Sequence, residues 1–266
     1  MSDIDFLADE ITKRYGTVKR ARGAFLYTAK GIRLTDMYEE GGRAILGWGG
    51  CSAFTQFKNV LSRGVTGSFN TDFMPRVGKA VSELLNSKRK IYVFHSKEEA
   101  VKIAASCFGQ LWMMWKPWSE VAVTWADVSC VVIEPPLPWV GDITLVAVKE
   151  DVAVPETVQG VRIASPVAAA VTRSIYDMIA AVQVREEKNW FLYDTVLTKY
   201  WTRKGPYLYP KVSREDYRDF ILHCLDQELV ISPDYDVPSI VPFGVDRGVF
   251  SKLKNRSFLC QNSEVR

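Results

Sequence analysis

With 266 residues, the chain is long enough for one large domain or two modest ones. Apolar residues make up 47% of it and charged residues 24%, which is typical of a soluble globular protein. The formal net charge of +3 is too small to indicate a nucleic-acid partner, and no apolar run approaches the length of a membrane span. We therefore expect no nucleic acid and no membrane among the partners.

The N-terminal residues, MSDIDFLADEITKRYG, are acidic and lack a continuous apolar core, so we do not expect a signal peptide. Five cysteines occur without CxxC spacing, at Cys51, Cys107, Cys130, Cys224 and Cys260. Those inside apolar patterns are typical of reduced core residues in a cytosolic protein. The only histidines are His95 and His223, which argues against a His-rich metal site. We predict a cytoplasmic protein without a metal centre.

The first part of the chain predicts a helix over Asp5–Tyr15 and then two or three short strands between Gly23 and Trp48. Helices are expected over Cys51–Ser62 and Met74–Leu85, the second because its apolar residues recur with the helical period. A strand at Ile91–Phe94 follows.

The stretch YVFHSKEEAVKIAASCFGQLW (92–112) predicts a strand that leads into a helix. We expect this helix to run from Glu98 to Met114, with Ser96 and Glu99 forming a capping box at its start. Further strands are predicted at 120–125 (EVAVTW), 128–135 (VSCVVIEP) and 142–151 (DITLVAVKED). Alternating strands and helices favour a mainly parallel sheet covered by helices.

The segment AVPETVQG (153–160) has the composition of a linker. After it we predict a helix over 165–187 with Pro166 in its first turn, and a second helix over 189–201. A strand (207–212), a helix with Ser213 as N-cap (213–228), a strand (229–233) and a final helix (245–255) follow. These elements suggest a smaller α+β unit. The predicted segments are therefore 1–50, with short strands, 51–158 and 159–266.

Several stretches, in the same order along the chain, resemble class-III aminotransferases, which are enzymes dependent on pyridoxal phosphate (PLP). GIRLTDMYEEGGRAILGWGG resembles the N-terminal segment of proteins of that family. It matches the spacing of their motif at Asp36, Gly41 or Gly42, Leu46 and Gly47. VFHSKEEAVKIA resembles the strand, S-G-[ST]-E-A loop and helix of the family, and VSCVVIEPPLP resembles its V-I-x-E-P strand. IASPVAAAVTRSIYDMI resembles the N-P-[LV]-A-x-A-A helix, and LVISPDYDVPSIVPFGV a segment near the C-terminus. An ordered set is more specific than any single motif.

The resemblance implies an α/β chain with the aspartate-aminotransferase fold, the type I fold of PLP-dependent transferases. In that fold a large cofactor domain with a mainly parallel sheet is accompanied by a small domain built from both termini. Here the chain is much shorter than the family, and the missing part falls between Ala100 and Pro166. We therefore expect a trimmed large domain and a small α+β C-terminal domain.

The chain departs from the family at each element that would hold PLP. In the phosphate loop the family's Gly and Ser/Thr are replaced by Lys97 and Glu98, and a carboxylate there would repel a dianionic phosphate. No aromatic-His-Gly segment follows the helix after Ser96. No D-E-[VI] motif follows Glu134, although the Asp of that motif pairs with the pyridinium nitrogen in the family.

The Schiff-base lysine of the family has no clear counterpart either. In GDITLVAVK the spacing from Asp142 to Lys149 is one residue longer than in the family pattern. Because successive side chains of a strand point to opposite faces of the sheet, Lys149 would point away from the cofactor. A better register matches LVAVKEDV to the strand after the lysine loop and puts the lysine position near Leu137. We therefore expect no bound cofactor. The alternative is a minimal PLP-dependent aminotransferase with Lys149 as the Schiff-base lysine and with Ser96 and Lys97 on the cofactor phosphate. His95 is more typical of a structural residue at the end of a strand and is kept only as a ligand contact.

The leading hypothesis is a non-catalytic, aminotransferase-like protein, a pseudoenzyme that acts in binding or assembly. Because members of the family are dimers with active sites between subunits, the resemblance implies a homodimer, and a heteromeric complex is the other possibility. The aromatic segment LWMMWKPWSEVAVTW (111–125) is the candidate contact surface, since aromatic residues are enriched in interfaces.

Other chemistry finds little support. The sequence shows no Ser-His-Asp order and no P-loop. Pairs of adjacent carboxylates occur at Glu39-Glu40, Glu98-Glu99 and Glu186-Glu187. Adjacent positions on a helix do not face each other, so we expect these pairs to be solvated charges.

Overall fold

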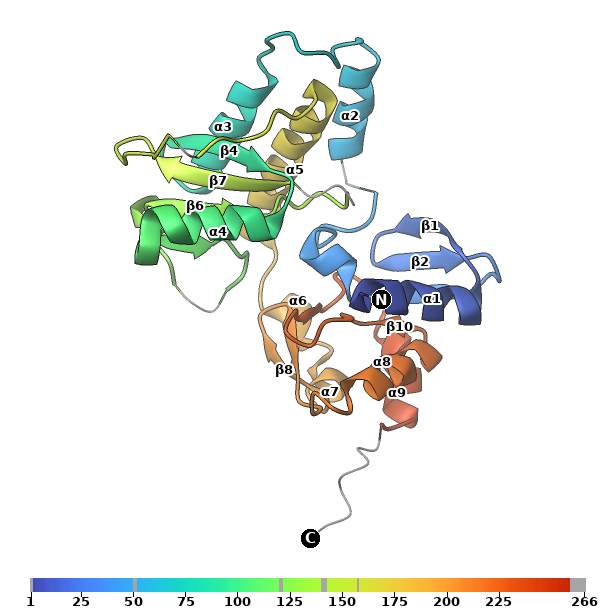
Figure 1. Ribbon diagram of the computed structural model, residues 1–266. Helices are drawn as coiled ribbons and strands as arrows, with labels where there is room; N and C mark the ends of the chain where they lie inside the picture. The colour runs from blue at the N-terminus through green and yellow to red at the C-terminus, as the bar shows by residue number, and fades with distance from the viewer. Residues whose placement is uncertain (1, 50–51, 120–121, 140–142, 157, 259–266) are drawn as a thin grey trace. The chain divides into compact units, whose positions relative to one another are not determined.

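The computed structural model describes residues 2–49, 52–119, 122–139, 143–156 and 158–258. The chain divides into two compact units: a central unit, Gly50–Val184, and a terminal unit formed by Met1–Gly49 together with Arg185–Arg266 (Figure 1). This division differs from the segments expected from the linker-like composition at 153–160, because the long helix after that segment packs within the central unit. Both termini contribute to the terminal unit.

The central unit contains a four-stranded sheet in the order β4-β7-β6-β5. Its strands are β4 (Arg89–Phe94), β5 (Trp112–Met114), β6 (Cys130–Ile133) and β7 (Thr144–Lys149). β7 runs antiparallel to both of its neighbours, and only β5 and β6 are parallel. This corrects the expectation of a mainly parallel sheet. Residues 134–143 are fewer than the dozen or more that a parallel crossover needs, so the chain returns from β6 in the opposite direction.

Helices cover both faces of this sheet, with α4 (Lys97–Phe108) in front and α3 (Phe73–Leu84) and α5 (Ser165–Val184) behind in Figure 1. α4 packs its small residues Ala100 and Ala104 against β6 and β7. All four residues of β6 and the first five of β7 are buried. Continuous burial of this kind is expected of strands that are covered on both faces.

α4 ends earlier than the sequence pattern predicts. The helix stops at Phe108, and Gly109 follows with a φ of 53°, a left-handed conformation that glycine adopts without steric cost. The chain then forms β5, so the prediction of a single helix to Met114 is wrong. The predicted strand at 120–125 is also wrong for its described residues, 122–125, which contain only the start of a 3₁₀ turn.

Among the described residues, α5 is the one helix long and apolar enough to cross a membrane by length and composition alone. It begins with Pro166 in its first turn, as predicted. Most of its apolar side chains are buried, although Val182 and Val184 near its C-terminal end are 41% and 70% exposed, and the helix packs against α3 and α2 (Ala53–Leu61). Its charged residues Arg173 and Asp177 pair with each other at 2.8 Å. These contacts are those of a core helix of the central unit.

The terminal unit is organised around a four-stranded sheet in the order β1-β2-β3-β10. β1 (Val18–Arg22), β2 (Phe25–Thr28) and β3 (Arg33–Asp36) form an antiparallel meander, and β10 (Leu229–Val230) adds to β3 in parallel. A second sheet has the order β11-β9-β8, with β8 (Trp201–Lys204), β9 (Tyr207–Pro210) and β11 (Ser239–Ile240).

Helices of the terminal unit are mostly short. They are α1 (Asp3–Tyr15), α6 (Lys188–Phe191), α7 (Asp194–Leu197), α8 (Tyr217–Asp226) and α9 (Ser251–Asn255). Four 3₁₀ helices complete the described chain. η1 (Glu39–Gly42) and η4 (Arg247–Phe250) belong to the terminal unit, and η2 (Gly109–Leu111) and η3 (Trp125–Asp127) belong to the central unit. The single helix predicted over 189–201 is therefore replaced by α6, α7 and the start of β8. Ser213 caps a turn that precedes α8, because its hydroxyl accepts from the N–H of Asp216, the residue before the helix.

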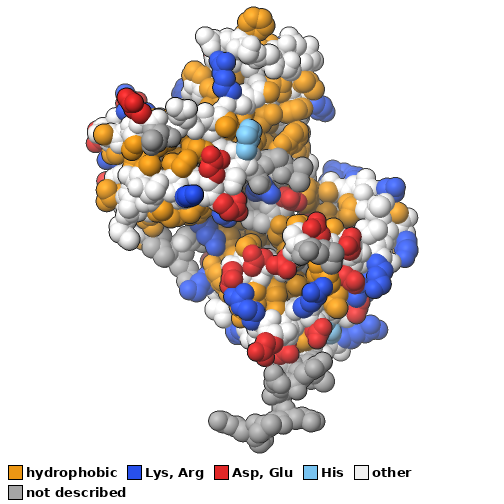
Figure 2. Space-filling view, viewed as in Figure 1, with side chains coloured by type: hydrophobic (Ala, Val, Ile, Leu, Met, Phe, Trp, Pro, Cys, Tyr) orange, Lys and Arg blue, Asp and Glu red, His pale blue; other side chains and the backbone are white. Residues whose placement is uncertain are grey.

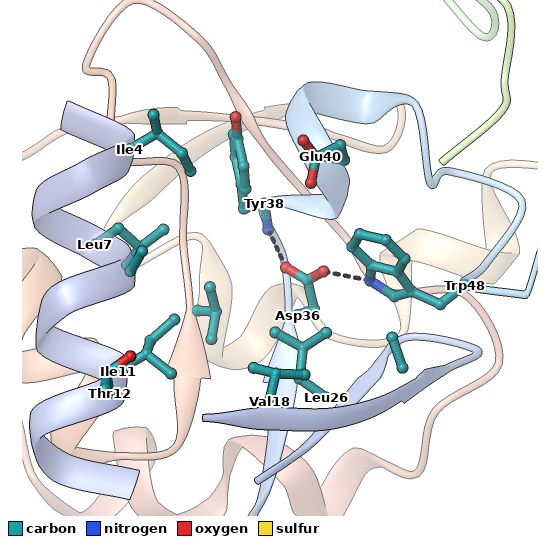
Figure 3. A pocket seen from close by; sticks show the side chains of 13 residues that line it. Ile4, Leu7, Ile11, Thr12, Val18, Leu26, Asp36, Tyr38, Glu40 and Trp48 are labelled. Atoms are coloured by element: carbon teal, nitrogen blue, oxygen red, sulfur yellow. Dashed lines mark hydrogen bonds between the residues drawn. The ribbon is translucent and has the colours of Figure 1, made fainter. Parts of the chain in front are cut away.

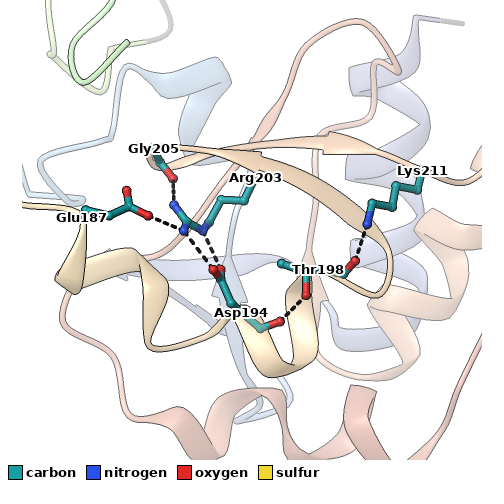
Figure 4. A network of polar contacts seen from close by, with 6 residues as sticks. All are labelled: Glu187, Asp194, Thr198, Arg203, Gly205 and Lys211. Carbon is teal, nitrogen blue, oxygen red and sulfur yellow. Dashed lines mark hydrogen bonds and ion pairs between the residues drawn. The ribbon is translucent and has the colours of Figure 1, made fainter. Parts of the chain in front are cut away.

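A buried guanidinium ties α7 to the β8–β9 hairpin (Figure 4). Arg203 on β8 donates from Nε and Nη2 to the two carboxylate oxygens of Asp194 on α7, and from Nη1 to the carbonyl of Gly205 at 2.8 Å. Glu187 adds a further ion pair. The Arg203 side chain is only 9% exposed, so its charge depends on these partners.

Charges of both signs are mixed on the surface. On the face shown in Figure 2, acidic and basic side chains are interspersed over the terminal unit, and hydrophobic side chains are exposed on the central unit around α4. Nucleic-acid binding usually requires a basic face, so the mixture does not alter the prediction of no nucleic-acid partner.

Candidate functional site

The junction between β4 and α4 holds the residues that the alternative hypothesis assigns to a cofactor phosphate. The hydroxyl of Ser96 accepts from the N–H of Glu99 at 3.2 Å, which confirms Ser96 as the N-cap of α4. The reciprocal bond from the N–H of Ser96 to the Glu99 side chain is not formed, so the predicted capping box is only half present. The same hydroxyl donates to Oε2 of Glu98 at 2.7 Å and thereby lowers the pKa of that carboxyl. The cap thus uses the donors that would hold a phosphate and keeps a carboxylate beside them.

Lys97 is engaged by a carboxylate at the same edge of the sheet. Its Nζ lies 2.6 Å from Oε2 of Glu134, the residue that directly follows β6. An anion at the start of α4 would therefore meet Glu98 and Glu134, and would have to replace an existing partner of Lys97. His95, next to the cap, is exposed.

Lys149 lies at the opposite end of the same pair of strands. In the antiparallel register of β4 and β7, Lys149 is opposite Arg89, whereas Phe94 is opposite Thr144. Five residues of strand separate the two ends, which corresponds to about 17 Å. The amine of Lys149 lies 4.0 Å from Asp151 instead. The structure does not bring Lys149 together with Ser96 and Lys97, and one pyridine ring cannot present its aldehyde to one end and its phosphate to the other.

The position that the better register assigns to the lysine carries no amine. Leu137 is buried, and its N–H donates to the carbonyl of Pro135 at 2.7 Å. Residues 140–142, which come soon after Leu137 in the sequence, lie outside the described chain. The residues present at the end of β4, at Leu137 and at Lys149 therefore do not fit PLP. Among the described residues, no group of three or more His, Cys, Asp or Glu side chains could hold a metal ion.

A later segment of the chain lies against the edge of β4 close to this junction. The N–H of Val161 donates to the carbonyl of Val93 at 2.7 Å. A Cβ at Gly160 would lie 2.8 Å from the backbone nitrogen of Val93, so only glycine allows this approach. Val158, from the same segment, is buried in the core beneath α4.

The aromatic segment predicted as a contact surface is partly exposed. Trp115 is buried, whereas Leu111 and Met113 are 62% and 37% exposed. A pocket of ≈ 310 Å³ in the central unit is lined by residues of this segment and by two helical side chains: Trp115, Lys116, Pro117, Trp118, Ser119, Ala122, Val123, Trp125, Leu84 and Val182. The segment thus combines side chains that pack within the unit with others that reach its surface.

One pair of carboxylates expected to be solvated is not. Glu39 is only 3% exposed, and its neighbour Glu40 is partly buried. Both have left-handed φ angles, 49° and 54°, which are uncommon for residues other than glycine. The cause is Asp36, whose Oδ1 accepts from the N–H groups of Tyr38 and Glu39 and so turns the chain inward. The sequence signal was an Asp that can accept from N–H groups two and three residues later.

Comparison with known proteins agrees with this architecture. No family model matches the chain. An uncharacterized protein of Treponema pallidum is 28% identical over an alignment of 289 positions, which covers 88% of this chain and 91% of that protein. An ornithine aminotransferase from Plasmodium yoelii superimposes with a TM-score of 0.70 at 11% identity, covering 96% of this chain and 97% of the other.

A further similar structure is an ornithine aminotransferase from Toxoplasma gondii with partial occupancy of PLP at its active site. It has a TM-score of 0.66 at 11% identity and covers 95% of this chain and 92% of the other. Likeness at such low identity establishes the fold and leaves the chemistry to the residues of the site. The chain has the α/β fold of the PLP-dependent class-III aminotransferases, in a trimmed form with mixed sheets.

Proposed function

We propose that this protein is a non-catalytic relative of the aminotransferases, which acts in binding or assembly and forms no aldimine with PLP. The observation that carries the proposal is the separation of Lys149 from the start of α4, at opposite ends of the β4–β7 pair. Transamination requires a lysine amine at the aldehyde, an acid at the ring nitrogen and anchorage for the phosphate in one place.

Local contacts support the same conclusion. The hydroxyl of Ser96 is used by the helix cap, and Lys97 is paired with Glu134. Leu137 stands near the position at which the resemblance would require the lysine. A single missing element could be compensated by a neighbour, but here the amine and the phosphate anchorage are lost together.

We further propose a homodimer in the cytoplasm, with the 111–125 segment as its contact surface and with a heteromeric complex as the other possibility. Leu111 and Met113 support this choice, because they expose apolar surface beside half-buried tryptophans. Contact surfaces are enriched in aromatic residues and methionine.

Reductive trapping tests the absence of an aldimine. The protein is incubated with excess PLP, reduced with borohydride, digested and analysed by mass spectrometry, beside a Lys149→Arg variant. We expect scattered, substoichiometric phosphopyridoxyl groups on exposed lysines, with the same total in both proteins. A stoichiometric group on Lys149 that disappears in the variant would support the minimal PLP-dependent aminotransferase instead.

A further inference from the structure

The terminal unit contains a pocket of ≈ 320 Å³ between α1 and the β1-β2-β3-β10 sheet (Figure 3). Its volume corresponds to about ten water-sized groups. The pocket is lined by Ile4, Leu7, Ala8, Ile11, Thr12, Val18, Ala21, Leu26, Asp36, Tyr38, Glu40, Trp48 and Val230. Most of these residues are apolar. In Figure 3, Ile4, Leu7 and Ile11 of α1 line one side, across from the strands.

At its polar end the pocket contains a buried carboxylate. Asp36 is 1% exposed and lines the pocket. Its Oδ1 accepts from the N–H groups of Tyr38 at 2.9 Å and Glu39 at 3.0 Å, and its Oδ2 accepts from Nε1 of Trp48 at 2.6 Å. A carboxylate has about four lone-pair positions, so one position on Oδ2 remains available. All three donors are neutral, and the charge of Asp36 is not paired with a cation by any of them.

A second carboxylate lies near the first. Glu40 lines the same pocket, and its negative charge adds to the effect of burial, which raises the pKa of Asp36 to about 6. Glu40 pairs with Arg43, whose Nη2 lies 3.5 Å from Oε1 of Glu40, but Arg43 does not line the pocket. The charged side chains that line the pocket are two carboxylates, with no Lys or Arg among the described lining residues.

These features select one class of ligand. A neutral apolar molecule would fill the pocket without compensating the charge of Asp36, and an anion would be repelled by both carboxylates. We propose that this pocket binds a small amphipathic cation, a protonated amine whose hydrocarbon part contacts the α1 side chains and whose ammonium group lies at Asp36 and Glu40. The proposal is independent of the function proposed above, because the pocket lies entirely within the terminal unit.

Three probes with the same six-carbon chain test the charge requirement: n-hexylamine, which is protonated at neutral pH, hexan-1-ol and hexanoate. Each is titrated into the full-length protein by calorimetry. We expect saturable binding of hexylammonium with a Kd at least about tenfold lower than that of hexan-1-ol, and weaker binding still for hexanoate; tenfold corresponds to ~1.4 kcal/mol. Absence of saturable hexylammonium binding, or hexanoate binding of equal strength, would overturn the proposal.

Two variants and a control locate the site. Glu40→Gln should raise the Kd for hexylammonium about tenfold and leave that for hexan-1-ol unchanged. Ala8→Trp places a large side chain at the rim on α1 and should abolish binding of both probes. Asp9→Asn removes the same charge from an exposed position of α1 that does not line the pocket, and should change neither Kd. Circular dichroism verifies folding of each protein. Equal effects of Glu40→Gln and Asp9→Asn, or full binding by the Ala8→Trp variant, would contradict the assignment.

Discussion

Lys97 and Glu134 form an ion pair of 2.6 Å that joins the first residue of α4 to the residue after β6. The two residues lie at the strand–helix junction that the sequence resemblance assigns to a cofactor phosphate, and they form an ion pair with each other there. The junction thus consists of β4, the Ser96 cap and α4, and the charge of Lys97 is paired with Glu134 of the same chain.

We expect this ion pair to contribute little to stability, because the side chains of Lys97 and Glu134 are both partly exposed. Lys97→Ala and Glu134→Ala should each lower the free energy of unfolding by less than about 1 kcal/mol. The coupling energy obtained from these two variants and the double mutant should also be below about 1 kcal/mol. Urea denaturation of the four proteins measures these values. A coupling energy above about 2 kcal/mol would show that the pair is far better shielded from solvent than its exposure indicates.

The Ser96 cap should contribute more than the ion pair does. Ser96→Ala leaves the N–H of Glu99 without its side-chain acceptor and should lower the free energy of unfolding by about 1 kcal/mol. Ser106→Ala, an exposed position within the same helix, is the matched control and should change it by at most about 0.5 kcal/mol. Equal values for both variants in urea denaturation would argue against the cap.

The Arg203 network in the terminal unit should be among its most sensitive polar features. Asp194→Ala removes the bidentate partner of a guanidinium that is 9% exposed and should lower the free energy of unfolding by about 3 kcal/mol. Lys211→Ala breaks only an exposed hydrogen bond to the carbonyl of Thr198 and should cost less than about 0.5 kcal/mol. Thermal and urea unfolding of both variants test the difference, and a small effect of Asp194→Ala would mean that Glu187 can hold Arg203 alone.

Glu39 should make the protein less stable as the pH rises. Burial, and then the charge of Asp36, raise the pKa of Glu39 well above its ordinary value in the folded state. Its carboxyl is protonated in both states below the ordinary pKa of 4.5, and above that pH the unfolded state releases the proton more readily than the folded state. The contribution of Glu39 to stability is therefore present at low pH and is lost as the pH rises toward the folded-state pKa.

The measurement compares wild type with Glu39→Gln in urea at several pH values. The stability of the variant relative to wild type should increase above about pH 4.5, by up to ~1.4 kcal/mol per pH unit. Glu215→Gln, at an exposed position, serves as the control and should follow wild type. A difference between Glu39→Gln and wild type that stays constant with pH would contradict the expected ionisation.

The proposed dimer gives a prediction about the 111–125 segment. The double substitution Leu111→Ser and Met113→Ser removes exposed apolar surface and should shift the protein from dimer to monomer in sedimentation at micromolar concentration. Phe191→Ser, at an equally exposed position of the terminal unit, should leave the dimer intact. A monomeric wild type, or a double variant that remains a dimer, would count against this surface.

The sequence by itself determined the elements whose signals are local. The period of apolar residues specified α3, Pro166 marked the first turn of α5, and Ser96 capped α4. These features depend on contacts within a few residues, which any tertiary context preserves. The ordered motifs also pointed to the correct fold, since together they cover most of the chain.

Only the tertiary structure decided the features that depend on long-range contacts. β5 replaced the last turn of the predicted α4 because Trp112–Met114 found a partner in β6, and the direction of β7 followed from the short connection after β6. The distance between Lys149 and Ser96 depends on strand register, which local propensity does not encode. Glu39 is buried in a turn that is held by the hydrogen bond from its N–H to Oδ1 of Asp36. The sequence showed only that Glu39 and Glu40 are two adjacent charges.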